Sequence, residues 1–299
     1  MKNDNQMRIS GLLLIIALFG CGKEETPQTE AIKYEGSQKV TVTGYSDNLM
    51  EPFLSRDGAI LIFNNSNDAS VDTNLHWATR SNDTSFEYMG EVAGVNTMSL
   101  EGVPSMDTNG VLYFVSTREY DQTLATIYQA SFISGTATNV TQVAGISKNQ
   151  VGWLNFDVEV NASGEFLYSV DGRFDQTGGP HESDIFIAQK MTGEFQRLSN
   201  SNEILKNINT VALEYAACIS ENNLELYFTR VEVPLSSSSM PRILFSTRNN
   251  VNEPFGQPAT IQSISGFVEA ATITPDGNLY YHKRDETGKF SLYMTKRVK

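Results

Sequence analysis

Residues 274–297, TPDGNLYYHKRDETGKFSLYMTKR, carry the pattern that decides the fold of this 299-residue chain. The stretch opens on a turn dipeptide, Asp276-Gly277, and continues into an aromatic run, Leu279-Tyr280-Tyr281. It ends with a hexamer at residues 292–297 that reads hydrophobic-x-x-small-x-basic. Turn glycines accept the positive φ angles of tight hairpins, and aromatic runs favour strands. The stretch therefore predicts a β-hairpin.

The same pattern occurs five times along the chain. Its turn residues are Gly58, Gly110, Gly164, Asn223 and Gly277, so that successive copies are 52, 54, 59 and 54 residues apart. The hexamer recurs at residues 75–80, 185–190, 243–248 and 292–297, with a looser copy at 127–132. A period of this length holds about four strands, the size of one propeller blade. No sustained helical period follows the first twenty residues, which argues against βαβ architectures.

The two ends of the chain complement each other. The fifth repeat lacks a fourth strand because the chain stops at Lys299, whereas Val40-Thr41-Val42 precedes the first repeat much as residues 259–261 precede the fifth. An N-terminal strand can therefore complete the last blade and cover its open edge. The sequence predicts an all-β fold: a five-bladed β-propeller of four-stranded antiparallel blades, forming a single domain at residues 39–299.

The repeats also resemble those of a known superfamily. Thr274-Pro275-Asp276-Gly277 and Ser55-Arg56-Asp57-Gly58 are similar to the Ser-Pro-Asp-Gly signature of TolB-like, WD-related propellers. Residues 255–258, Phe-Gly-Gln-Pro, look like the outer-strand entry in the lipoprotein branch of that superfamily. The resemblance covers residues 39–297. It implies the propeller fold and leaves function open, because propellers include both binding proteins and enzymes.

The N-terminal segment has the features of an export signal. Lys2 and Arg8 precede an uncharged apolar run at residues 11–20, which is too short to span a bilayer but suits a secretory signal. The run ends at Leu18-Phe19-Gly20-Cys21, which resembles a bacterial lipobox and implies that Cys21 is lipidated. We expect residues 1–20 to be a lipoprotein signal peptide and residues 21–38 to be the lipidated cysteine with a flexible tether. The alternative is an ordinary signal peptide with an incidental cysteine.

Charge and the start of the tether predict the location. Lys23-Glu24-Glu25 resembles the surface-export signal of Bacteroidetes lipoproteins, so that the protein is expected at the outer membrane, on the periplasmic face or on the cell surface. The chain has 22 basic and 35 acidic residues, for a net charge of −13. This charge argues against a nucleic-acid partner, and we expect contact with the membrane only through the lipid.

Each repeat carries an acid in the segment before its turn, which should form the innermost strand and line the central channel. These acids are Glu51, Glu101, Asp157, Glu214 and Glu269. Opposed carboxylates serve glycoside hydrolysis, one as the acid and the other as base or nucleophile. A shift of one residue reverses the face of a strand, so acids at unequal distances from the turn need not all point inward. The candidate catalytic residues are Glu51, Asp157, Glu214 and Glu269, and the alternative is a structural role in bonding loop amides.

Arginines recur in register as well, at Arg118, Arg173, Arg230 and Arg284. A guanidinium group can clamp a carboxylate or sugar hydroxyls through paired donors. Recurrence at the same place in successive repeats favours a structural role for these arginines, such as bridging adjacent blades.

The third repeat has an enlarged hairpin loop at residues 171–184. Its candidate binding residues are Asp171, Arg173, Phe174, Asp175, His181, Glu182 and Asp184. Oxygen-rich loops can hold Ca²⁺, and an exposed aromatic ring can stack on a sugar. The spacing matches no calcium-binding motif, so no metal site and no cofactor are predicted. A solvated loop tip is the alternative.

Motifs of common hydrolases are missing from the sequence. It contains no P-loop, GxSxG, HExxH or paired CxxC motif, which disfavours nucleotide hydrolysis, α/β-hydrolase and zinc-peptidase chemistry. We therefore predict a lipid-anchored binding or interaction module of the cell envelope, with a protein, peptide or glycan as partner. The main alternative is a glycoside hydrolase that uses paired carboxylates in the channel, and a structural envelope subunit is a third.

Overall fold

The computed structural model of the protein describes residues 32–68, 70–176 and 179–298. The predicted signal peptide, Cys21 and most of the predicted tether lie outside these residues. Within them, no helix is both long and apolar enough to cross a membrane.

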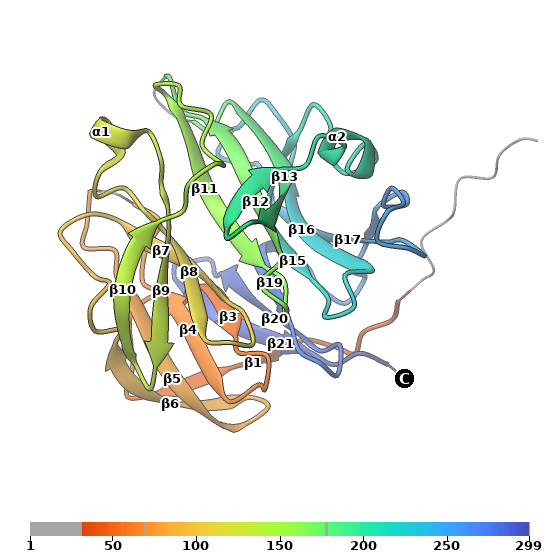
Figure 1. Ribbon diagram of the computed structural model, residues 1–299. Coiled ribbons are helices and arrows are strands. Elements are labelled where there is room, and N and C mark those ends of the chain that lie inside the picture. The colour runs from red at the N-terminus through yellow and green to blue at the C-terminus, as the bar shows by residue number, and fades with distance from the viewer. Residues whose placement is uncertain (1–31, 69, 177–178, 299) are drawn as a thin grey trace, which may run out of the picture.

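The described residues form five β-sheets with a common strand order, which are the blades of a propeller (Figure 1). Blade 1 contains β3 (Met50–Leu54), β4 (Ile60–Asn64), β5 (Leu75–Asn82) and β6 (Ser85–Glu91). Blade 2 contains β7 (Glu101–Met106), β8 (Val111–Ser116), β9 (Ile127–Ile133) and β10 (Thr136–Gln142). Blade 3 contains β11 (Trp153–Val160), β12 (Phe166–Arg173), β13 (Glu182–Met191) and β14 (Glu194–Arg197). Blade 4 contains β15 (Leu213–Ile219), β16 (Glu225–Val231), β17 (Arg242–Thr247) and β18 (Ala259–Thr260). Blade 5 contains β19 (Phe267–Ile273), β20 (Leu279–Arg284), β21 (Phe290–Thr295) and β1 (Gln38–Lys39).

The blades close into a ring. Each innermost strand contacts the innermost strand of the next blade, in the order β3, β7, β11, β15 and β19, and β19 contacts β3 again. The described residues contain only two short helices, α1 (Tyr120–Thr123) and α2 (Ser201–Ile204). The predicted all-β fold with five blades is confirmed.

The ring is closed by the N-terminal segment, as predicted, but with a different stretch of it. β1 pairs antiparallel with β21, so that Gln38 and Lys39 complete blade 5. The predicted residues 40–42 fall mostly in β2 (Thr41–Thr43), which pairs in parallel with β6 and adds a fifth strand to blade 1. The segment therefore joins the outer edges of the last and first blades, which leaves neither edge open at that seam.

The turn of each repeat has the backbone conformation that the sequence predicts. The φ angles are 72° at Gly58, 77° at Gly110, 75° at Gly164, 60° at Asn223 and 82° at Gly277. Glycine adopts this left-handed region without strain, and asparagine tolerates it better than most other residues. Turn chemistry in the sequence therefore sets the position of each inner hairpin.

A second shared feature is a bulge in every innermost strand. Pairing with the second strand shifts register between Met50 and Phe53 in blade 1 and between Asn155 and Val158 in blade 3. The same shift occurs in the other three blades. A bulge bends the strand and turns side chains to new directions, and Pro52 and Pro104 are tolerated there because the ladder is interrupted.

The apolar core lies between the blades. Five clusters of buried side chains each join two adjacent blades, including the pair formed by blades 5 and 1. The second strands are covered on both faces, which explains their continuous apolar runs, and Tyr113, Tyr168, Tyr227 and Tyr280 are all buried there. Burial of each such ring stabilises the fold by roughly 1.5–3 kcal/mol.

Candidate functional site

A cavity of about 640 Å³ opens at the end of the channel where the innermost strands begin, and all five blades contribute to its wall. This volume lies within the range of small-molecule sites. Three acids line it, Glu51 from blade 1, Asp157 from blade 3 and Glu269 from blade 5. We call these three residues the carboxylate cluster. Glu51 and Asp157 also line a separate void of about 30 Å³ farther along the channel, next to Ala217 and Ala271.

The rest of the cavity wall is mainly apolar. Most of its aliphatic side chains come from the first or second strands of blades 2 to 4 and the loops that lead into them, and these are Leu100, Val103, Val115, Leu154, Leu213 and Val231. Three phenylalanine rings, Phe156, Phe174 and Phe267, also line the cavity. The few polar groups in the wall include Asn67, Tyr215 and Arg284. Apolar walls with few polar groups are typical of a ligand pocket.

Glu269 is held by two donors. The hydroxyl of Tyr215 donates to Oε1 of Glu269, and Nε2 of His282 lies 3.2 Å from Oε2. Nδ1 of the completely buried His282 accepts the backbone N–H of Glu51 at 3.0 Å. Because Nδ1 is an acceptor in this arrangement, the imidazole is neutral and its proton is on Nε2, directed at Glu269. His282 therefore couples the position of Glu269 in blade 5 to the backbone of blade 1.

The other two members of the carboxylate cluster are buried. Nδ2 of Asn67 donates to Oε1 of Glu51 at 2.7 Å, and the backbone N–H of Ala216 donates to Oδ2 of Asp157 at 2.5 Å. Burial raises the pKa of Glu51. Burial also raises the pKa of Asp157 well above its usual value, and the charge of Glu51 adds to that rise. Both carboxyls therefore keep a proton at higher pH than an exposed acid does.

Glu214, the fourth candidate catalytic residue, lies outside the cavity. It is completely buried, and its Oε1 accepts Nε of Arg230 at 2.6 Å and the hydroxyl of Thr210 at 2.7 Å. Arg230 also donates to the carbonyl of Ile208 at 2.6 Å. This network attaches the loop before β15 to the first two strands of blade 4.

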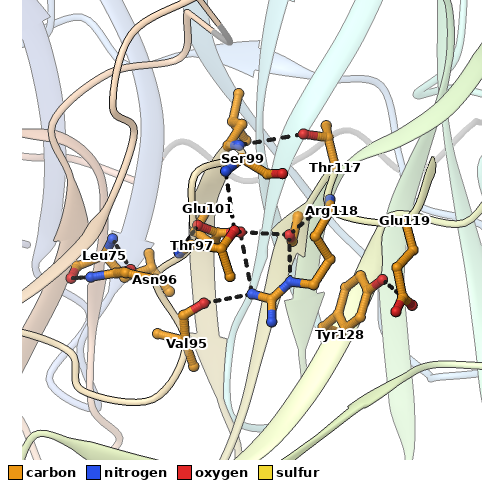
Figure 2. A network of polar contacts seen from close by, with 12 residues as sticks. Leu75, Val95, Asn96, Thr97, Ser99, Glu101, Thr117, Arg118, Glu119 and Tyr128 are labelled. Carbon is orange, nitrogen blue, oxygen red and sulfur yellow. Dashed lines mark hydrogen bonds and ion pairs between the residues drawn. The ribbon is translucent and has the colours of Figure 1, made fainter. Parts of the chain in front are cut away.

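Glu101 takes the same place in blade 2 and makes the same kind of network (Figure 2). Its carboxylate is 3.2 Å from Arg118 and accepts the backbone N–H of Thr97 at 2.7 Å. Arg118 also donates to the carbonyl of Val95. Arg118 and Arg230 therefore form ion pairs within one blade. They do not bridge adjacent blades, as the sequence pattern suggested. Contacts between blades do occur elsewhere, as between Arg297 and Glu225 at 2.9 Å.

The bulge explains why the acids separate into two groups. Glu101 and Glu214 each precede the last paired residue before the bulge, at equivalent positions of the repeat. Glu269 is itself the last paired residue, and Glu51 and Asp157 lie inside the bulge. Because the bulge changes the direction of side chains, a shift of one to three residues moves an acid from a buried ion pair to the cavity.

The candidate binding loop is brought to the cavity only in part. Phe174 lines the cavity and packs edge-to-face on Phe156, with ring centroids 5.5 Å apart. Asp171 is buried in β12, where Arg197 donates to it at 2.7 Å.

The remaining polar residues of that loop form contacts with one another or are exposed. Arg173 pairs with Glu182 at 2.7 Å and with Asp175 at 3.1 Å. Nε2 of His181 lies 3.4 Å from the carbonyl of Gln176, and Asp184 is exposed on β13. Within the described ranges, no group of three or more His, Cys, Asp or Glu side chains is arranged to hold a metal ion.

Three residues that hold the carboxylate cluster were not among the candidates from the sequence. They are His282, Tyr215 and Asn67. A signal was available for His282, because it follows the repeated aromatic run that forms a buried second strand. Tyr215 carried a weaker signal, since it is next to Glu214 in an innermost strand.

Comparison with known proteins supports the fold. No protein-family model matches the sequence, and no curated protein is similar to it. Among solved structures, the putative exo-β-1,3-galactanase of Bifidobacterium bifidum s17 is similar with a TM-score of 0.58 and 12% identity, over 89% of this chain and 96% of that one. The α-L-arabinofuranosidase of Podospora anserina, solved with cellotriose, has a TM-score of 0.56 and 9% identity, over 92% and 98%.

A propeller of the TolB group is similar as well. The putative TolB of Agrobacterium tumefaciens has a TM-score of 0.50 and 12% identity, over 88% of this chain and 79% of that one. At such identities these likenesses concern the fold, and they agree with the five-bladed propeller seen here. The TolB-like nature of the sequence repeats stays a prediction.

Proposed function

We propose that this protein is a glycoside hydrolase whose reacting groups are the carboxylate cluster. The observation that carries the proposal is the meeting of Glu51, Asp157 and Glu269, from three different blades, in one cavity large enough for a sugar. In the described part of the chain, none of the three forms an ion pair with a lysine or arginine. The solved structures with a similar fold include several glycoside hydrolases, which supports this proposal over that of a binding module.

The roles follow from the surroundings of each carboxyl. Asp157, with its raised pKa, is the proton donor to the leaving glycosidic oxygen. Glu269 accepts hydrogen bonds from Tyr215 and His282, which orient it as the base for an attacking water. The glycosidic C–O bond breaks as water adds to the anomeric carbon; the Asp157 proton goes to the leaving oxygen and a water proton goes to Glu269. The charge of Glu51 adds to the rise in the pKa of Asp157.

Substitution of the two acids tests this assignment. We expect Glu269→Gln and Asp157→Asn each to lower the rate of hydrolysis by about 100-fold or more, because each removes an acid–base group. The measurement is release of reducing ends from a panel of plant and bacterial glycans. Glu253→Gln, at an exposed position away from the cavity, is the control and should retain full activity. Unchanged activity in both cavity variants would overturn the assignment.

A glycan-binding module without hydrolysis is the second candidate function. It is favoured by the three phenylalanine rings in the cavity wall, since aromatic faces can stack on sugar rings. Retention of a glycan by the native protein without any release of reducing ends would support this candidate.

We also propose that the protein is attached to the outer membrane by a lipid on Cys21. The lipobox-like residues 18–21 support this proposal. The test is fractionation of cells that produce the Cys21→Ala variant, which should move from the membrane to the soluble envelope fraction. A variant that stays with the membrane would contradict it. Protease treatment of whole cells would then separate surface display from the periplasmic face.

A further inference from the structure

One of the four arginines in register differs from the others in its surroundings. Arg118 has Glu101 as its ion-pair partner, Arg173 has Glu182, and Arg230 has Glu214, as given above. In the part of the chain that the structure describes, the fourth, Arg284, forms no ion pair with a carboxylate. It lines the cavity of the carboxylate cluster and is exposed there.

The repeat explains why Arg284 is left without an acid. The position that holds Glu101 in blade 2 and Glu214 in blade 4 precedes the last paired residue before the bulge. In blade 5 the last paired residue is Glu269, so the equivalent position is Val268, which is buried and carries no charge. Blade 5 thus has an arginine near the end of its second strand, as blades 3 and 4 do, but no carboxylate at the position of Glu101 and Glu214.

Arg284 lies next to the reacting groups on the same face of the hairpin. Arg284 is opposite Phe267 in the ladder, and His282 is opposite Glu269. Residues two apart in a strand point to the same face, so the Phe267–Arg284 pair follows the Glu269–His282 pair along the cavity wall. The two pairs are about 7 Å apart along the strand. One monosaccharide can span that separation.

Stacking fixes the orientation of the guanidinium group. Its central carbon lies 3.7 Å from the centroid of the Phe267 ring. A guanidinium that covers an aromatic face with its plane keeps its N–H donors at the edge, where they match the two oxygens of an oxyanion. Because Arg284 is exposed, these donors are accessible from the cavity.

We propose that Arg284 binds an oxyanion of the ligand, so that the glycan taken by the cavity is an acidic one, carrying a uronic acid carboxylate or a sulfate ester. The inference rests on the proposed function in that it takes the ligand to be a glycan. The anionic group contacts Arg284 while the glycosidic bond of the same sugar lies at Glu269 and Asp157. Charge therefore selects the substrate at one end of the cavity, and the carboxylate cluster acts at the other.

The experiment compares the two variants Arg284→Gln and Lys283→Gln with the native full-length protein. Lys283 is the matched control, because it is adjacent, loses the same charge on substitution and points to the opposite face of β20. Each protein is first tested on a glycan array of uronic acid, sulfated and neutral oligosaccharides. Calorimetry then measures the Kd of the acidic oligosaccharides that bind best and of their neutral counterparts.

We expect the native protein to prefer one acidic class over its neutral counterpart. Arg284→Gln should weaken binding of the acidic oligosaccharide by about 10- to 100-fold, which is the usual effect of a charged hydrogen bond. Binding of neutral oligosaccharides should not change, and Lys283→Gln should bind like the native protein. The acidic class that the native protein binds shows whether the oxyanion at Arg284 is a carboxylate or a sulfate.

Three outcomes would overturn the inference. They are equal binding of acidic and neutral oligosaccharides by the native protein, no binding of any acidic probe, and an equal loss of affinity in Arg284→Gln and Lys283→Gln.

Failure of the proposed function has a different signature. Acidic glycans would then bind in an Arg284-dependent way without being cleaved. Conversely, cleavage of the acidic glycan by Arg284→Gln at the native rate would retain the hydrolase and overturn the role of Arg284.

Discussion

The innermost strands of this propeller present two groups of acids that come from the same repeat. Glu101 and Glu214 are completely buried, and each is bonded to an arginine and a threonine of its own blade. Glu51, Asp157 and Glu269 line the cavity and, among the described residues, have no arginine or lysine partner. The comparison shows that position relative to the bulge decides whether an acid of this repeat stabilises a blade or becomes available for chemistry.

The largest effect on stability is expected at the ion-paired acids. Glu214→Ala leaves the partly buried Arg230 without its carboxylate, and we expect the free energy of unfolding to fall by about 3 kcal/mol. Chemical denaturation measures this change. The control is Glu232→Ala, whose contact with Arg242 at 3.7 Å is exposed and should contribute less than about 1 kcal/mol. Equal effects at both sites would remove the distinction between the two groups of acids.

The pH dependence of stability should depend on the cavity acids. The pKa of Asp157 is higher in the folded protein than in the unfolded chain, where it is about 3.9. The folded state therefore binds more protons above pH 4, so the contribution of Asp157 to stability is complete below that pH and is lost as pH rises through the folded pKa.

Asp157→Asn removes this loss. Relative to the native protein, the variant should gain stability between pH 4 and pH 8, by about 1.4 kcal/mol for each unit by which the pKa is raised. Denaturation curves across this range measure the difference. If the curves of the two proteins stayed parallel, the Asp157 carboxyl would not hold a proton in the folded state.

The smallest effect on stability is expected from loss of the single hydroxyl group that hydrogen-bonds to the carboxylate cluster. Tyr215→Phe removes the donor to Glu269 and should lower the free energy of unfolding by about 1 kcal/mol. If Glu269 is the base, hydrolysis should also slow several-fold because the carboxylate is less well oriented. Tyr45→Phe is the control, since the Tyr45 hydroxyl is buried without a hydrogen-bond partner among the described residues and should be dispensable. A loss at Tyr45 as large as at Tyr215 would argue for a packing effect only.

Much of the fold could be predicted because it repeats. Five turns at Gly58, Gly110, Gly164, Asn223 and Gly277 gave the number of blades, and each has the expected positive φ angle. The missing fourth strand of the fifth repeat predicted closure by the N-terminal segment. The closing strand is β1 and not residues 40–42. Both outer edges at the seam can pair with the N-terminal segment, and residues 41–43 pair with β6 of blade 1 while β1 pairs with β21 of blade 5.

The site could be predicted only as a set of candidates. Three of the four candidate acids line the cavity, and Glu214 does not. The difference depends on a bulge that the sequence does not mark, because it results from pairing between strands. His282 reaches the Glu51 amide only because the last blade packs against the first.

The sequence by itself determined the five blades, their strands and turns, and the recurrence of an acid and an arginine in successive repeats, because turn residues and apolar runs act locally. The tertiary structure decided which acids share a cavity and which arginine has no acid. Both outcomes depend on the register of the bulged strands and on closure of the ring. These bring together groups far apart in the chain, such as the Glu51 amide and the His282 imidazole, which are separated by 231 residues.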